Sequence, residues 1–133
     1  MVRGIRNNNP GNIDRNSTKW LGMADKQTDA RFIVFKEMKY GCRAILKLLS
    51  TYYNKYNLYT VKDIISRWAP STENDTSAYY KKVAKDLGVD PKEKLIFTKD
   101  IYIALGKAIT FYECGSEANS ISDYTWEEAY KLL

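Results

Sequence analysis

The stretch Gly4-Ile5-Arg6-Asn7-Asn8-Asn9-Pro10-Gly11-Asn12-Ile13 is the most demanding part of this chain to fold. Its asparagine amides carry donor and acceptor groups, and folding must give a partner to each group that it buries. Pro10-Gly11 predicts a turn. The stretch is therefore either an asparagine-rich surface turn that leads into a hairpin or a loop that faces a ligand. In the second case the amides of Asn7, Asn8, Asn9 and Asn12 bind hydroxyl and acetamido groups.

Length and charge narrow the possible classes of protein. A chain of 133 residues, 44% of them hydrophobic, fits one domain with a real core, and we expect residues 1–133 to form a single domain. The net charge of +5 suits an anionic partner such as a bacterial wall polymer. The basic residues are scattered among acids, so we expect no nucleic-acid partner. No apolar stretch is long enough to span a membrane, and no signal peptide is recognisable, which predicts synthesis in the bacterial cytoplasm.

The sequence contains no histidine. This absence excludes Ser-His-Asp and Cys-His catalysis, histidine general bases and the usual zinc sites that contain histidine. Cys42 and Cys114 do not form a disulfide framework, and we expect both to be free thiols. Any chemistry must use carboxylates, tyrosines, lysines or amides, and we expect neither a metal nor a cofactor.

Residue patterns predict an α+β fold that is mainly α. Residues 13–35 are typical of a small antiparallel β ribbon of two or three strands, with strands at 19–23 and 31–35. From Tyr40 to Tyr56 the apolar residues recur with a helical period, which predicts a long core helix. Further helices are predicted at 61–68, 76–87 and 98–113, and a last one, capped by Thr125, reaches Leu132.

Glu113 is the first candidate for a catalytic acid. It lies at the end of the predicted helix 98–113, where the helix dipole disfavours a charged carboxylate. Partial burial beside Phe111 or Tyr112 would further favour the acid form that a general acid needs. A solvated glutamate at a helix end explains the same local features.

Glu73-Asn74-Asp75-Thr76 is the second polar cluster. Such residues are common at the start of a helix, where they cap free N–H groups. They also follow Trp68 and a proline corner, an arrangement that presents a carboxylate to a sugar ring. Glycoside cleavage often uses a second carboxylate, and either Glu73 or Asp75 could pair with Glu113 in this way. The residues proposed to bind a sugar beside this cluster are Trp20, Trp68, Thr76 and Tyr79, with the aromatic ones stacking on sugar faces.

Several of these motifs resemble a family of small proteins of tailed phages and prophages that are often labelled virion structural proteins. The resemblance rests on the asparagine stretch, Trp20-Leu21-Gly22, residues 32–35, Tyr40-Gly41 and residues 67–79, and so covers most of the chain. It implies a phage protein that is associated with the virion or that lies near lysis functions.

A second resemblance, to glucosaminidases and lytic transglycosylases of the lysozyme superfamily, implies a mechanism. Those enzymes place a catalytic glutamate at the end of a helix, before an asparagine-containing loop and a β region. Here the loop comes first and Glu113 comes last, so the resemblance implies a circularly permuted lysozyme-like domain. In this scheme Glu113 protonates the leaving oxygen, and Glu73 or Asp75 stabilises the oxocarbenium ion or positions water.

Two functions follow as competing expectations. The first is a monomeric peptidoglycan glycosidase, hydrolase or lytic transglycosylase, which cuts between N-acetylmuramic acid and N-acetylglucosamine. It would act at the cell wall after release or as part of a phage particle. The alternative is a virion structural or assembly protein without enzymatic activity, in which the asparagine loop and the aromatic residues form a protein interface.

Overall fold

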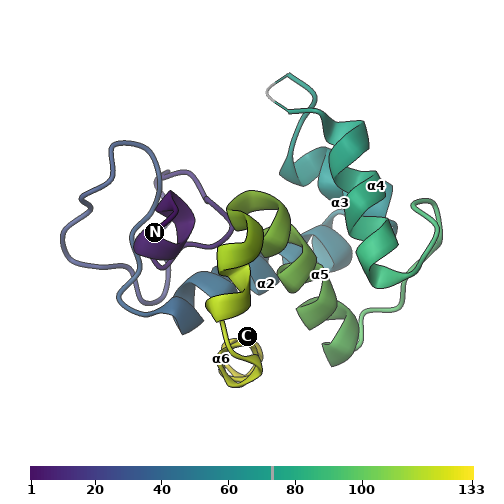
Figure 1. Cartoon of the computed structure of the whole chain (residues 1–133). Coiled ribbons are helices and arrows are strands. Elements are labelled where there is room, and N and C mark those ends of the chain that lie inside the picture. Colours follow the sequence, from purple (N-terminus) through teal and green to yellow (C-terminus); the bar gives the residue numbers. More distant parts are fainter. Residues whose placement is uncertain (73) are drawn as a thin grey trace.

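The computed structural model describes residues 1–72 and 74–133, and helices dominate this part of the chain (Figure 1). In chain order the elements are α1 (Arg3–Arg6), α2 (Met38–Lys55), α3 (Val61–Trp68), α4 (Thr76–Leu87), α5 (Lys99–Cys114), the 3-10 helix η1 (Gly115–Ser120) and α6 (Asp123–Lys131). The expectation of a mainly α protein is confirmed. None of the described helices combines the length and the apolar character needed to cross a membrane.

Helices α2 and α5 form the centre of the core. Helix α2 packs against α5 and α6, while α4 packs against α3 and α5. The apolar faces follow the helical period, with Ile45 and Leu49 of α2 and Leu105 and Ile109 of α5 fully buried. The N-terminal segment lies beside this helical body, at the left of Figure 1, and α1 contacts α5. Residues from both ends of the chain therefore meet at α5.

Helix ends follow local capping rules. Helices α3 and α4 have the predicted bounds: the Thr60 hydroxyl accepts a hydrogen bond from the Asp63 N–H, and Gly88, at φ 71°, ends α4 in the left-handed conformation. The start predicted for the last helix is wrong. Ser122 caps α6 by accepting from the Thr125 N–H at 3.1 Å, so Thr125 lies within the first turn.

The predicted β ribbon at residues 13–35 is wrong. In the described part of the chain this segment has only two isolated antiparallel bridges, Asp14 with Phe32 and Met23 with Phe35. The residues 19–23 and 31–35 have the composition of strands, but they form no continuous ladder.

The side chains of Gln27 and Asp29 bond to backbone groups that could otherwise pair with another strand in a β ladder. The Gln27 amide donates to the carbonyls of Ala24 and Val34, both at 2.9 Å, and accepts from the Val34 N–H at 2.8 Å. Asp29 Oδ1 accepts from the N–H groups of Arg31 and Phe32, both at 2.8 Å. Such side-chain to backbone bonds compete with regular secondary structure, and here they hold residues 13–35 as an ordered loop.

Candidate active site

Asn9 is a structural residue at the base of the N-terminal loop, residues 7–13. Its side chain is completely buried, and its amide donates to the carbonyls of Ile13 at 3.0 Å and Ile33 at 2.9 Å. Its Oδ1 accepts from the Ile13 N–H at 3.0 Å. The Asn9 amide is therefore engaged inside the protein, where it ties the turn to residue 33.

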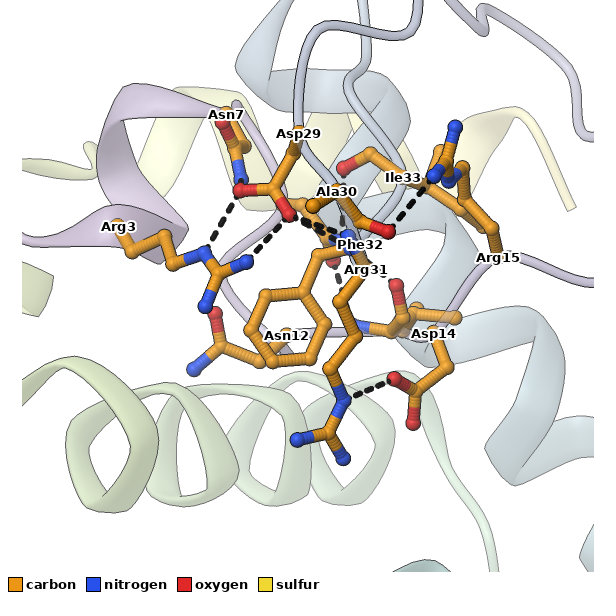
Figure 2. A network of polar contacts seen from close by, with 12 residues as sticks. Arg3, Asn7, Asn12, Asp14, Arg15, Asp29, Ala30, Arg31, Phe32 and Ile33 are labelled. Atoms are coloured by element: carbon orange, nitrogen blue, oxygen red, sulfur yellow. Dashed lines mark hydrogen bonds and ion pairs between the residues drawn. The ribbon is translucent and has the colours of Figure 1, made fainter.

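Asn7 and Asn8 also bond to the protein. Asn7 donates to Asp29 Oδ2 at 2.9 Å, and Asp29 receives two bonds from the Arg3 guanidinium at 2.6 and 2.7 Å (Figure 2). The Arg3 guanidinium, helped by the backbone N–H groups of Phe32 and Arg31, holds the pKa of Asp29 well below its ordinary value.

The amide of Asn8, a residue with a left-handed φ of 53°, donates to the Phe35 carbonyl at 3.0 Å. A Cβ added to Gly41 would lie 1.9 Å from the Asn8 carbonyl oxygen, so a glycine at 41 lets this loop lie directly on α2. Asn7, Asn8 and Asn9 together shape the loop, and none of them lines the cleft described below.

Asn12 has a different position from the other three asparagines. Its Nδ2 donates to Glu113 Oε1 at 3.1 Å, and its backbone has a left-handed φ of 48°. Its Oδ1 is buried and has no hydrogen-bond partner among residues 1–72 and 74–133. The N-terminal loop thus delivers one amide to the carboxylate at the end of α5.

Tyr79 holds the other oxygen of the Glu113 carboxylate. Its hydroxyl donates to Glu113 Oε2 at 2.8 Å. Tyr79 is buried and stacks on Tyr112, with ring centroids 3.8 Å apart. Burial, followed by the charge of Glu113, raises the pKa of Tyr79, so its hydroxyl stays protonated and acts as a donor.

Glu113 and Asn12 line one cleft of about 510 Å³, which we call the Glu113 cleft. This volume lies in the range of pockets that bind small molecules or segments of a polymer. The lining residues come from the N-terminal loop, α2, the end of α3 and the end of α5. They are Gly11, Asn12, Ile13, Asp14, Arg31, Phe32, Leu48, Tyr52, Trp68, Ala69, Pro70, Asn74 and Glu113.

Of the two residues proposed as a second carboxylate, Asp75 is the one that the structure describes, and it does not line this cleft. Asp75 is exposed and caps α4 by accepting from the Ala78 N–H at 3.1 Å. Glu73 lies outside the described residues. Among the described residues, Asp14 is the other carboxylate that lines the cleft, and it is paired with Arg31 at 2.6 Å (Figure 2).

The remaining predicted sugar-binding residues divide into two groups. Trp68 lines the cleft, and Tyr79 lies behind Glu113 as its hydrogen-bond donor. Trp20 packs against the hydrophobic core and does not line the cleft. Thr76 donates to the Ala69 carbonyl at 2.5 Å, so it supports one wall of the cleft from behind.

Sequence reasoning missed several residues that line the cleft, among them Asp14, Arg31, Phe32 and Tyr52. Residues 31–35 have the composition of a strand, and Tyr52 continues the apolar period of α2, so both patterns indicate structure rather than a site. The Phe32 ring lies between two guanidinium groups, 4.5 Å from that of Arg3 and 4.9 Å from that of Arg31. The signal available in the sequence was a cationic residue, Arg31, next to the aromatic Phe32.

Cys114 is a packed thiol next to the site. Both cysteines are free, as expected, and both are buried; Cys114 Sγ donates to the Pro10 carbonyl at 3.3 Å. Burial and the neighbouring Glu113 raise the pKa of Cys114 to about 11. The thiol is therefore protonated near neutral pH and helps to seat the N-terminal loop on α5.

A second cavity, of about 590 Å³, lies over α5 between α4 and α6. Its charged lining residues form two internal ion pairs, Lys82 with Asp86 and Lys107 with Asp123, each at 2.5 Å. The Glu113 cleft is the smaller of the two, but it joins two carboxylates, two amides and aromatic side chains in one place. Its chemistry makes it the candidate active site.

Comparison with known proteins relates the chain to a phage protein. No protein-family model matches the sequence. The protein named Protein P5 of Pseudoalteromonas phage PM2 is 39% identical over 133 residues, an alignment that covers 98% of this chain and 79% of that protein. The resemblance to phage proteins is confirmed at this level.

Proposed function

Because this chain belongs to the family of Protein P5 of Pseudoalteromonas phage PM2, we propose a phage function for the Glu113 cleft, the cleavage of peptidoglycan glycan strands. The bond cut lies between N-acetylmuramic acid and N-acetylglucosamine. The observation that carries this proposal is the position of Glu113, half-buried in a cleft and held at both oxygens by the neutral donors Asn12 and Tyr79.

Glu113 acts as the general acid in this proposal. Its protonated form gives a proton to the glycosidic oxygen while the bond from that oxygen to the anomeric carbon breaks. The two donors fix the plane of the carboxyl group, and fixed geometry is a large part of enzymatic catalysis. Asp14, held by Arg31, faces the same cleft and supplies negative charge to an oxocarbenium-like transition state.

The other walls of the cleft suit a sugar polymer. Trp68 and Tyr52 offer aromatic faces to the apolar sides of sugar rings, and Asn74 offers an exposed amide at the rim. The net charge of +5 favours approach to an anionic wall. Whether water or a hydroxyl of the substrate completes the reaction distinguishes a hydrolase from a lytic transglycosylase, and product analysis separates the two.

The test is cleavage of purified sacculi, followed by loss of turbidity and by mass spectrometry of the released glycan fragments. We expect activity in the wild type and loss of it in Glu113→Gln. Glu93→Gln is the matched control, because Glu93 is an exposed glutamate outside the cleft. An inactive wild type, or a Glu113→Gln variant as active as Glu93→Gln, would refute the enzymatic proposal.

A non-enzymatic virion component is the second candidate, and membership of a phage protein family is the observation that favours it. Exposed apolar side chains such as Ile96 (77% exposed) and Tyr124 (71%) would then contact other virion proteins. Mass spectrometry of purified particles tests this role. It predicts the protein in particles, no wall cleavage, and poor incorporation of Ile96→Lys but not of Glu113→Gln.

A further inference from the structure

One hydrogen-bonding group beside Glu113, the Asn12 Oδ1, lacks a partner among the described residues. The Asn12 amide uses its Nδ2 to donate to Glu113 Oε1 at 3.1 Å, whereas its Oδ1 is buried without a partner among the described residues. A buried acceptor without a donor is costly, and most such groups in folded proteins are satisfied. The cost is removed in any state of the site in which the Asn12 Oδ1 accepts a hydrogen bond.

The hydrogen bond between the Tyr79 hydroxyl and Glu113 Oε2 has a defined direction. The Tyr79 hydroxyl is buried, and Glu113 Oε2 is the acceptor that it has among the described residues. A proton on Oε2 would leave this buried hydroxyl without its acceptor, which is costly. When Glu113 is protonated, its proton is consequently carried by Oε1, the oxygen that faces Asn12.

A protonated Oε1 cannot be bonded by the Asn12 amide in its present orientation, because two donors would face each other. We propose that the Asn12 side-chain amide turns over when Glu113 takes up a proton, so that Oδ1 accepts from the Glu113 hydroxyl. Asn12 is then a positioning residue that holds Glu113 in both protonation states. Its catalytic meaning rests on the proposed glycosidase function.

The surroundings of Asn12 suit both orientations. Rotation about the terminal bond of an asparagine side chain is soft and roughly two-fold. The Asn12 Oδ1 and the Asn9 carbonyl oxygen each lie 3.0 Å from the point where a Cβ on Gly4 would stand. After the turn, Nδ2 occupies the former Oδ1 position, on the side of Gly4 where the Asn9 carbonyl oxygen also lies. The acceptor that had no partner then accepts from the Glu113 hydroxyl.

The titratable groups around Glu113 come from α4, α5 and the N-terminal segment. Tyr79 from α4 and Cys114 from α5 both have raised pKa values and remain neutral. Asp14 and Arg31, from the N-terminal segment, are paired with each other in the lining of the cleft. During cleavage the proton leaves Oε1 for the glycosidic oxygen, and that oxygen takes the electron pair of the broken bond. Asn12 then turns back and donates to the carboxylate.

Nuclear magnetic resonance tests the turn without any substrate. In labelled wild-type protein, the Glu113 carboxyl carbon reports the titration, and nuclear Overhauser effects report which protons lie close to the Gly4 α-protons. We expect an effect between the Asn12 amide protons and a Gly4 α-proton to be weak for ionised Glu113 and to strengthen in step with its protonation. An effect that stays constant through the titration overturns the inference.

Glu113→Gln supplies a second, independent measurement. Its amide nitrogen takes the Oε1 position, because Oε2 must still accept from Tyr79, and Asn12 should then be turned at every pH. Glu93→Gln should behave as the wild type does, and a Glu113→Gln spectrum that matches wild type with ionised Glu113 overturns the inference. If Glu113→Gln loses cleavage but the Asn12 amide of the wild type does not rotate, this inference alone is refuted. If the Asn12 amide rotates but the wild type cleaves no wall, the proposed function is refuted and the inference about Asn12 stands.

Discussion

The Asn12 amide nitrogen and Glu113 Oε1 are 3.1 Å apart, although 101 positions separate the two residues in the chain. Two other contacts fasten the same ends of the molecule together. The Val2 N–H donates to both carboxylate oxygens of Glu117 at 2.9 and 3.0 Å, and Cys114 Sγ donates to the Pro10 carbonyl. The candidate site therefore exists only when the N-terminal loop is docked on the end of α5.

Removing the Tyr79 hydroxyl should weaken both the fold and the site. Tyr79→Phe leaves Glu113 Oε2 without its donor, and we expect a loss of about 1–3 kcal/mol in the free energy of unfolding. Wall cleavage should fall by as much as about 100-fold, because the carboxyl group loses one of its two supports. Urea unfolding and the sacculus assay measure the two effects. Tyr80→Phe, on the same helix, is the control, and it should change neither the free energy of unfolding nor the rate of wall cleavage.

Asn9 should be the asparagine on which stability depends most. Asn9→Ala removes three buried hydrogen bonds and leaves the Ile13 N–H and the Ile33 carbonyl short of partners. We expect a loss of about 2–4 kcal/mol in the free energy of unfolding. Asn119→Ala changes an exposed asparagine and should cost less than about 0.5 kcal/mol. Equal stabilities of the two variants in chemical denaturation would contradict the structural role of Asn9.

The Arg3 and Asp29 pair should make stability depend on pH on the acid side. Because the pKa of Asp29 is lowered in the folded state, its contribution is present above the unfolded value of about 3.9 and is lost as the pH falls below it. Thermal unfolding between about pH 7 and pH 2 measures this dependence. Asp29→Asn should be less stable than wild type near neutrality, and the difference should shrink in acid. A difference that stays constant with pH would argue against this linkage.

Both thiols should react slowly in the native protein. The pKa of Cys114 is about 11 and that of Cys42 is also raised by burial, so little thiolate is present at about pH 8. Labelling with a chromogenic disulfide reagent should therefore be slow in buffer and rapid in denaturant, with two thiols counted in total. Fast native labelling of Cys114 would mean that the loop around Pro10 opens from α5.

Local patterns were sufficient for α3 and α4 because the information that specifies a helix lies within one or two turns. Thr60 three residues before Asp63, and Gly88 after Leu87, mark ends that the structure reproduces. The same kind of pattern failed at residues 13–35. There the partners of the backbone are the side chains of Asn9, Gln27 and Asp29, and a composition rich in β-branched and aromatic residues does not reveal them.

The sequence by itself determined which groups were available: a chain without histidine, a glutamate at the end of an amphipathic helix, and an asparagine-rich turn near the N-terminus. Only the tertiary structure decided how those groups are used. It buries Asn9 as a support, brings Asn12 to Glu113, and places Asp14 rather than Asp75 in the cleft. The physical reason is that each of these outcomes depends on which distant donor or acceptor satisfies a buried polar group, and such a choice is made only when the whole chain packs together.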